Sequence, residues 1–456
     1  MNEFNQFTAL FLIFLIGSLL IQLLLFYRQV KHLQSHQNQV PARFQEKVSL
    51  LEHKKAIKYF FEKIKLKLLT ILVDYALIIF LTVGGLVSFV VLKIPDFIQT
   101  QIFSTTGEHA PTYLFSVIDY INQSVLIPLI GSMMLVGFVA FLNLLINVPF
   151  SLYKQFVIEK KFDFNKMTLK TYFSDLIKTL LLAIFIGSPF FMGIIWLISE
   201  REVLGELWWV FLWVIVSIFT VGIQVIYPIT IAPIFNKFTP LENGSLKTRL
   251  ESLLDRCNFK SAGLFLMDGS RRSSHGNAFF AGLGKSRRIV LFDTLVEKLS
   301  DSEIEAVLAH ELGHYKCGHI PRMMIMQLIL SFLFFATFGY FIESSEFNLG
   351  LGIHQEISTI SSAYGDTSFL IIFFLFINVI LFPLEPITSM LSRKYEFEAD
   401  KYAAKKSKPE DLISALVKLY RDNASPVTTD SWFSMFFDSH PPASLRIDAL
   451  ELKEVK

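Results

Sequence analysis

The sequence predicts a predominantly α-helical, multi-pass membrane protein with seven transmembrane helices and a small α+β domain beside the membrane. Of its 456 residues, 52% are hydrophobic and 18% are charged, so the chain carries more apolar surface than one soluble core buries. Seven apolar runs reach the roughly 20 residues that cross about 30 Å of hydrocarbon. A His-Glu-x-x-His motif lies in a hydrophilic segment between the fifth and sixth runs.

The predicted spans follow the apolar runs in chain order. They are 7–26, 68–92, 125–150, 175–198, 207–231, 321–342 and 368–390. The first run resembles a signal peptide in length, but MNEFNQF has no basic segment and no small-residue cleavage site follows it. We therefore expect it to be a true span.

The connecting segments differ in their content of lysine and arginine. The basic segments are 27–67 and 151–174, and those nearly free of lysine and arginine are 93–124, 199–206 and 343–367. The positive-inside rule places the basic segments in the cytosol and the N-terminus outside. With seven spans, the long hydrophilic segments 232–320 and 391–456 then both lie in the cytosol, where they can form one domain.

This topology divides the chain into four units. They are a membrane unit (1–231), the first part of a hydrolase domain (232–320), two further spans (321–390) and the second part of that domain (391–456).

The net charge of +2 gives no basic surface for a nucleic acid partner. Both cysteines, Cys257 and Cys317, fall in predicted cytosolic segments, so we expect no disulfide. The basic run 54–67 is most simply a topology signal attracted to anionic lipid.

The segment 232–320 has the pattern of a small mixed unit. NGSLKTRLESLLDRC predicts a helix with a leucine stripe. AGLFLMDG, NAFFAGL and RRIVLFDTLV predict three short strands, the second at a sheet edge. Ser300 and Glu303 have capping-box spacing at the start of LSDSEIEAVLAHELGHYK, which predicts a second helix that carries the His-Glu-x-x-His motif.

His310 and His314 are four residues apart on that helix, so both imidazoles can reach one ion. Two nitrogen ligands and an open position suit zinc, and Glu311 can accept a proton from a water at that position. The five-residue pattern also arises by chance in roughly one chain per hundred of this length. A zinc site therefore needs a third ligand from elsewhere in the cytosolic domain.

The stretch SRKYEFEAD, just after the last span, offers that ligand. Glu396 and Asp400 share one helix face, whereas Glu398 points about 200° away from Glu396 at 100° per residue. We expect Glu396 to be the third ligand and Asp400 to orient a ligand imidazole. The alternative is a solvated, charged helix start. His319, nine residues after His310, is expected to face away from the metal.

Six segments together carry a resemblance to a known family. They are VLAHELGHYKCGH, SRKYEFEAD, GSRRSSHGNAFFAG, RRIVLFDTL, FVIEKKFDFNK and SHPPASLR. In their order along the chain they resemble the motifs of the type I CaaX prenyl proteases, which are integral-membrane zinc metalloproteases. The resemblance implies a hollow helical barrel around a water-filled chamber, capped by the zinc domain. It also implies removal of the last three residues of a prenylated CaaX sequence.

The resemblance also implies roles for single residues. His310, His314 and Glu396 match the zinc ligands and Glu311 the general base, in agreement with the helical spacing above.

Four more residues match the family's site. Asn277 matches the residue that hydrogen-bonds the substrate backbone, His440 the histidine that binds the peptide and stabilises the oxyanion, and Asp400 and Arg446 a supporting pair. From the residues alone, Asn277 is equally a turn residue after Gly276, and His440, before two prolines, is a surface histidine.

We therefore predict a membrane-embedded zinc endopeptidase with one Zn²⁺ per chain. Its expected partners are the lipid bilayer and a peptide or protein substrate prenylated at a C-terminal cysteine. Two alternatives stay open: a quality-control metalloprotease with no prenyl requirement, and a non-catalytic seven-span transporter or receptor. A bacterial inner membrane and a eukaryotic endoplasmic reticulum both fit the sequence, and no oligomeric state is predicted.

Overall fold

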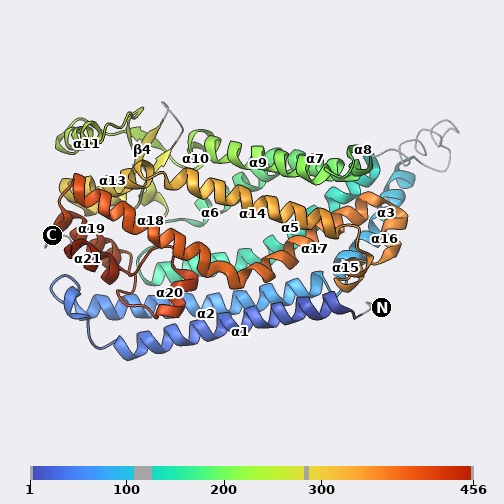
Figure 1. Ribbon diagram of the computed structural model, residues 1–456, viewed down its shortest axis with the longest axis horizontal. Coiled ribbons are helices and arrows are strands. Elements are labelled where there is room, and N and C mark those ends of the chain that lie inside the picture. Colours follow the sequence, from blue (N-terminus) through green and yellow to red (C-terminus); the bar gives the residue numbers. More distant parts are fainter. Residues whose placement is uncertain (1–3, 107–125, 282–286, 453–456) are drawn as a thin grey trace.

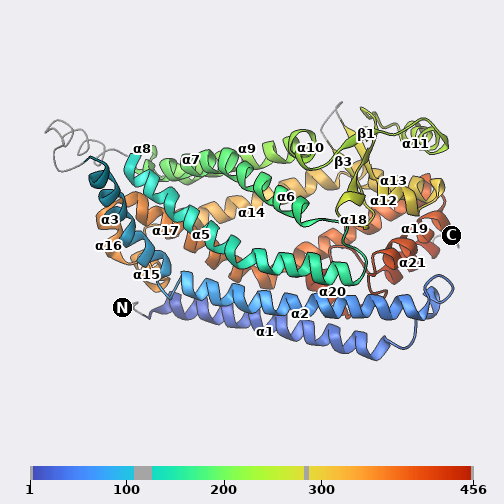
Figure 2. The same ribbon diagram turned by 180° about the vertical axis from the view of Figure 1, so that it is seen from behind.

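The computed structural model describes residues 4–106, 126–281 and 287–452. Long helices run along the long axis of the molecule, and the sheet with α11, α13, α19 and α21 lies at one end (Figures 1 and 2). The N-terminus lies at the opposite end from the C-terminus. The predicted helical, multi-pass fold class is confirmed.

The elements have the following bounds. The α-helices are α1 (Gln6–His36), α2 (Leu50–Leu81), α3 (Leu86–Thr106), α5 (Leu126–Tyr153), α6 (Leu169–Leu182), α7 (Ser188–Ser199), α8 (Arg201–Leu204), α9 (Trp208–Ile226), α10 (Ala232–Phe235), α11 (Ser245–Arg256), α12 (Asp293–Lys298), α13 (Asp301–Lys316), α14 (His319–Phe341), α15 (Ser345–Gly350), α16 (Gln355–Ile360), α17 (Ser362–Leu381), α18 (Glu385–Lys406), α19 (Pro409–Asp422), α20 (Ser431–Phe437) and α21 (Ala443–Glu451). The strands are β1 (Phe238–Pro240), β2 (Leu264–Met267), β3 (Ala278–Ala281) and β4 (Arg288–Phe292). The 3₁₀ and π turns are η1 (Ala42–Phe44), η2 (Lys154–Glu159), η3 (Ala183–Gly187), η4 (Tyr227–Ile231), η5 (Gly269–Arg271) and η7 (Phe382–Leu384).

Helices long and apolar enough to cross a membrane match the predicted spans. Within the described residues they are Gln6–His36, Ile127–Glu159, Leu169–Ser199, Trp208–Phe235, His319–Phe341 and Ser362–Lys406. The pair α2 and α3 brings the possible number to 7. Three of these stretches contain the π turns η2, η3 and η4. A π turn changes the helical register locally without ending the helix, so each stretch can still be one span.

The predicted span 68–92 contains a break. Its two helices are bent by 54° relative to each other. Gly85 has a φ of 72°, a left-handed conformation that glycine adopts without strain. A Cβ at Gly84 would lie 2.8 Å from the carbonyl oxygen of Phe80. Two successive glycines therefore allow the chain to leave α2 and begin α3 in a new direction.

The sheet has the order β1-β2-β4-β3. β2 runs parallel to β4, and β3 runs antiparallel to β4. The three predicted strands are present, and β3 lies at the sheet edge as expected. The three-residue strand β1 was missed because it is too short to show a period-2 pattern. The stretch after β4 forms α12 instead of continuing as a strand.

The helix α13 packs between the sheet and the C-terminal helices. Ser300 and Glu303 form the predicted capping box at its start. Its buried Ile304, Leu308 and Leu312 share one hydrophobic cluster with leucines of α11 and α19. This core holds the His-Glu-x-x-His helix rigidly against its neighbours, because buried side chains pack at crystal-like density.

Candidate metal centre

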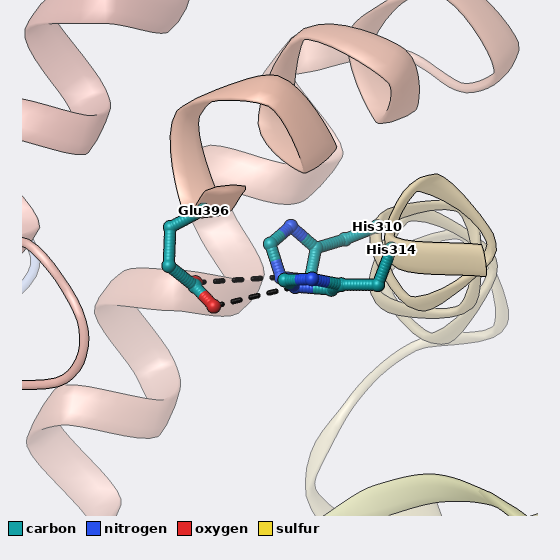
Figure 3. A group of neighbouring side chains, drawn as sticks. All are labelled: His310, His314 and Glu396. Atoms are coloured by element: carbon teal, nitrogen blue, oxygen red, sulfur yellow. Dashed lines mark hydrogen bonds and ion pairs between the residues drawn. The ribbon is translucent and has the colours of Figure 1, made fainter. Parts of the chain in front are cut away.

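Two helices bring together three predicted ligands. His310 and His314 project from α13 and Glu396 from α18, and the side chains point toward one another (Figure 3). The Nε2 atoms of the two histidines are 3.2 Å apart. The Glu396 carboxylate oxygens lie 3.5 Å from Nε2 of His310 and 3.3 Å from Nε2 of His314. The predicted convergence of these two segments is therefore present.

The spacing of the three ligand atoms fits a tetrahedral ion. Two ligands each about 2.0–2.1 Å from a tetrahedral zinc ion lie about 3.3 Å apart, and the three observed separations bracket this value. Glu396 is 4% exposed. Its Oε2 has no hydrogen-bond partner among the described residues, but Nη1 of Arg446 lies 3.2 Å from it and forms an ion pair with it. A buried carboxylate oxygen of this kind is stable when it binds a cation.

Gly313 allows the two helices to approach this closely. It lies between the ligand histidines on α13 and packs directly on Ala399 of α18. A Cβ at position 313 would lie 2.8 Å from Cα and 2.9 Å from the carbonyl oxygen of Ala399. Because both neighbouring atoms belong to the backbone, a larger residue would push α18, and Glu396 with it, away from the histidines.

The ring of His310 is oriented by a buried ion pair. Its Nδ1 lies 2.8 Å from Oδ1 of Asp400. Arg446 donates to both oxygens of Asp400, through Nε at 2.8 Å and Nη2 at 2.7 Å. Burial opposes a charge on His310, but hydrogen bonds to Asp400 and Glu396 raise its pKa to about 9. A metal therefore competes with a proton for this imidazole.

His314 has a different supporting group, which sequence reasoning missed. Its Nδ1 lies 3.0 Å from Nδ1 of His319, and Nε2 of His319 lies 3.0 Å from Oε2 of Glu398. The expectation that His319 faces away was wrong because α13 ends at Lys316 and Gly318 has a φ of 70°. This left-handed glycine starts α14 in a new direction. A glycine just after a helix is the signal that could have shown it.

The contacts of His319 determine which nitrogens carry protons. An imidazole that binds a metal through Nε2 keeps its proton on Nδ1, so with a metal bound His314 would donate to Nδ1 of His319. His319 then carries its own proton on Nε2 and donates it to Glu398. The carboxylate–imidazole–imidazole chain thus orients His314, just as Asp400 orients His310.

One cavity of about 340 Å³ adjoins the ligands and contains the other predicted residues. Asn277, Glu311, His440 and Arg446 line it together with His310. Burial raises the pKa of the Glu311 carboxyl above its usual range, which suits a group that exchanges protons near neutral pH. A peptide that enters this cavity meets the metal ligands, a proton acceptor and polar donors at once.

Asn277 and His440 both line this cavity. Asn277 immediately precedes the edge strand β3, and its Oδ1 accepts a hydrogen bond of 2.8 Å from the amide of Ala278. Nε2 of His440 lies 3.4 Å from Oε1 of Glu396, and its side chain is 60% exposed. The surrounding protein removes the ring partly from water, and this partial desolvation, together with the charge of Arg446, lowers the pKa of His440, although Glu396 opposes this. Both side chains are thus accessible from the cavity.

A second group with metal-binding side chains lies beside the first. Cys317, His319 and Glu398 each offer one ligand atom, and these atoms lie within 4.8 Å of one another. Both nitrogens of His319 already make contacts of 3.0 Å, however, one of them to a predicted ligand. Both cysteines of the chain are free, as expected.

Two family models match the chain in succession. The first, described as the N-terminal part of CAAX prenyl protease with five membrane helices, matches residues 29–237. The second, described as peptidase family M48, matches residues 240–454 and includes the two helices that carry the ligands.

Individual proteins and one solved structure are also similar. CAAX prenyl protease 1 of Saccharomyces cerevisiae is 40% identical over 330 residues, which are 70% of this chain and 72% of that protein. The Homo sapiens homologue of CAAX prenyl protease 1 is 34% identical over 348 residues, 67% of this chain and 70% of that protein. The crystal structure of S. mikatae Ste24p superposes with a TM-score of 0.82 at 29% identity, over 98% of this chain and 100% of that one.

Proposed function

We propose a function for this chain from one premise: it belongs to the CAAX prenyl protease 1 family of M48 peptidases. As a member it is a multi-pass membrane metallopeptidase. We propose that its metal is zinc and that it removes the C-terminal tripeptide from proteins or peptides prenylated at a CaaX cysteine. The convergence of His310, His314 and Glu396 beside the cavity that contains Glu311 carries this proposal.

The names of the relatives support the proposed substrate. The yeast, human and Arabidopsis thaliana relatives are all named CAAX prenyl protease 1 or its homologue. Membership in a peptidase family favours an enzyme over a non-catalytic transporter or receptor. The second family model also ends near the C-terminus, at residue 454, so the segment with His440 and Arg446 falls within its match.

The proposed reaction is direct attack of water on the peptide carbonyl. A zinc ion held by His310, His314 and Glu396 would lower the pKa of a water molecule and polarise the scissile carbonyl. Glu311 accepts the proton of the attacking water and then delivers it to the leaving amine nitrogen. Its burial favours this exchange, because the protonated and ionised forms become closer in free energy.

The remaining residues bind and orient the peptide in this proposal. The edge strand β3 pairs with the extended substrate backbone, and the side chain of Asn277 donates to that backbone. His440 lines the cavity and donates to the substrate oxygen that becomes negative in the transition state. Arg446 and Asp400 hold His310 in place and keep the site's charge balanced.

We further propose the predicted orientation in the membrane, with the N-terminus outside and the metal centre in the cytosol. The termini lie at opposite ends of the long helices, and the sheet lies at the C-terminal end (Figure 1). The segments 232–320 and 391–456 then form one catalytic domain, interrupted by the spans in 321–390. The membrane unit 1–231 and those spans form the wall of the proposed chamber.

A pair of matched peptides tests the function. The purified protein in detergent receives one CaaX peptide with a farnesyl cysteine and one without, and mass spectrometry detects the released tripeptide. We expect the farnesylated peptide to be cleaved at the predicted bond and with the higher kcat/KM. Equal turnover of both peptides would favour the quality-control alternative, and cleavage of neither would contradict a CaaX protease.

A further inference from the structure

Three lysines line one cavity at the end of the bundle that carries the metal centre. Lys63 and Lys67 of α2 and Lys154 of η2 line a cavity of about 520 Å³. Its walls also include the aromatic rings of Phe26, Phe60, Phe150 and Phe433. Within the described chain, no carboxylate forms an ion pair with these three lysines, whereas the neighbouring Lys65 lies 3.9 Å from Glu62. Glu159 and Asp74 are close enough to Lys63 and Lys67 to act on them electrostatically, but neither forms an ion pair with them, so the ammonium groups can still bind an anion beside an apolar wall.

A third cavity lies between this cavity and the catalytic cavity and shares lining residues with each. The intermediate cavity, of about 310 Å³, shares Phe60, Lys63 and Phe433 with the lysine cavity. It shares His440 and Tyr420 with the catalytic cavity. Lys63 and His440 thus line the same intermediate cavity.

The direction of β3 indicates which part of a substrate enters this space. An extended peptide that pairs antiparallel with the edge strand runs opposite to it. With the scissile bond at the metal ligands, its residues after that bond extend past Asn277 toward His275, and those before it toward Ala281. The C-terminal side of the substrate therefore leaves the metal centre on the side of His275.

A continuous set of contacts joins His275 to Lys63. Nε2 of His275 lies 3.7 Å from Oε2 of Glu159. The hydroxyl of Tyr59 donates to Glu159 at 2.6 Å, and Nζ of Lys63 lies 4.6 Å from the centre of the Tyr59 ring. Glu159 and Tyr59 are both buried, so this set of contacts is a fixed part of the wall. These contacts place Lys63 on the His275 side of the metal centre, where the C-terminal part of the substrate is expected to leave.

We propose that Lys63, supported by Lys67 and Lys154, binds the C-terminal carboxylate of the substrate and so sets the distance from that end to the cleaved bond. The inference rests on the proposed function, because a CaaX tripeptide ends in a free carboxylate. Three extended residues reach about 10 Å, and the intermediate cavity that both His440 and Lys63 line would have to accommodate them. The phenylalanine rings suit the aliphatic side chains of the tripeptide.

Two farnesylated peptides that differ only at the C-terminus test the inference. One ends in a free carboxylate and the other in an amide, and kcat/KM is measured for each with purified full-length protein. We expect the wild type to prefer the acid by about tenfold to a hundredfold, the range for a hydrogen bond to a charged group. The variant Lys63→Met should lower the acid-to-amide ratio to about one, and Lys63→Arg should restore most of the preference.

A matched lysine on the same helix is the control. Lys65 lies outside the three cavities, so Lys65→Met should keep the wild-type ratio. If Lys63→Met does not fold, as judged by metal content, Lys67→Met and Lys154→Met should each lower the ratio severalfold.

The wild type alone can overturn the inference. Equal cleavage of acid and amide contradicts the carboxylate site while leaving the peptidase function in place, and cleavage of neither contradicts both. An anionic lipid headgroup is the competing occupant of these lysines. Equal cleavage together with loss of copurified anionic lipid from Lys63→Met would assign the cavity to lipid.

Discussion

Gly313 and Ala399 are packed so closely that a Cβ on Gly313 would lie 2.8 Å from the Cα of Ala399. This contact joins α13 to α18 between the two histidines and the carboxylate of the candidate metal centre. The separation of these helices sets the distances of 3.3 and 3.5 Å between Glu396 and the imidazoles. The glycine of the motif is therefore part of the candidate metal centre, although it offers no ligand atom.

The variant Gly313→Ala should separate the two helices. Overpacking of this kind costs about 1–3 kcal/mol of stability, and a displacement of about 1 Å costs roughly a hundredfold in rate. We expect weaker metal binding, measured by metal titration, and a kcat/KM lower by roughly a hundredfold, measured by peptide cleavage. Gly193→Ala is the control, because nothing lies within 4 Å of a Cβ there. Unchanged activity of Gly313→Ala would contradict the role of this contact.

The variant Glu311→Gln should separate chemistry from metal binding. Glu311 lines the cavity and offers no ligand to the candidate site, so the substitution removes the proton acceptor and leaves the metal. We expect unchanged metal content and a fall in kcat of about 10²–10⁴-fold. Cleavage at a near-normal rate would show that another group accepts the proton.

The variant Glu396→Ala should lose the metal. Removal of the third ligand leaves two imidazoles, so the loss of affinity should exceed the roughly 10–100-fold typical of an outer partner. Elemental analysis after dialysis measures it. Glu398→Ala removes a carboxylate two residues away that makes no contact with the ligand oxygens, and it should keep more metal than Glu396→Ala does. If Glu398→Ala lost more metal than Glu396→Ala, Glu398 would be the ligand instead of Glu396.

The variant His319→Phe should weaken the metal site without disturbing the packing. The His319 ring stacks on Tyr395 with centroids 4.3 Å apart, and phenylalanine keeps that contact. It removes the nitrogen that accepts from His314, for which we expect a metal affinity about 10–100-fold lower. Cys317→Ser, which leaves this hydrogen-bond chain intact, should have wild-type affinity. Equal losses in both variants would point to metal binding at Cys317 instead.

The sequence predicted the elements whose position depends on local periodicity. The spacing of His310 and His314 places them on one helix face, and the same argument separates Glu396 from Glu398. The capping box at Ser300 and the edge strand β3 also follow from local patterns. Each of these predictions needs only the geometry of one helix or strand.

The features that the sequence did not predict depend on changes of chain direction. Gly318 ends α13, so His319 returns toward His314 instead of continuing around the helix. Gly85 breaks the second span in the same way. The basic run 54–67 indicated a cytosolic loop, but only the packing of α1, η2 and α20 around α2 shows that Lys63 lines a cavity.

X-ray absorption at the zinc edge of the zinc-loaded, full-length protein tests the central claim most directly. A zinc ion held by His310, His314 and Glu396 should show only nitrogen and oxygen neighbours at about 2.0–2.1 Å, with one zinc per chain by elemental analysis of the same sample. A sulfur neighbour at about 2.3 Å would place the ion at Cys317, His319 and Glu398, and would contradict the account.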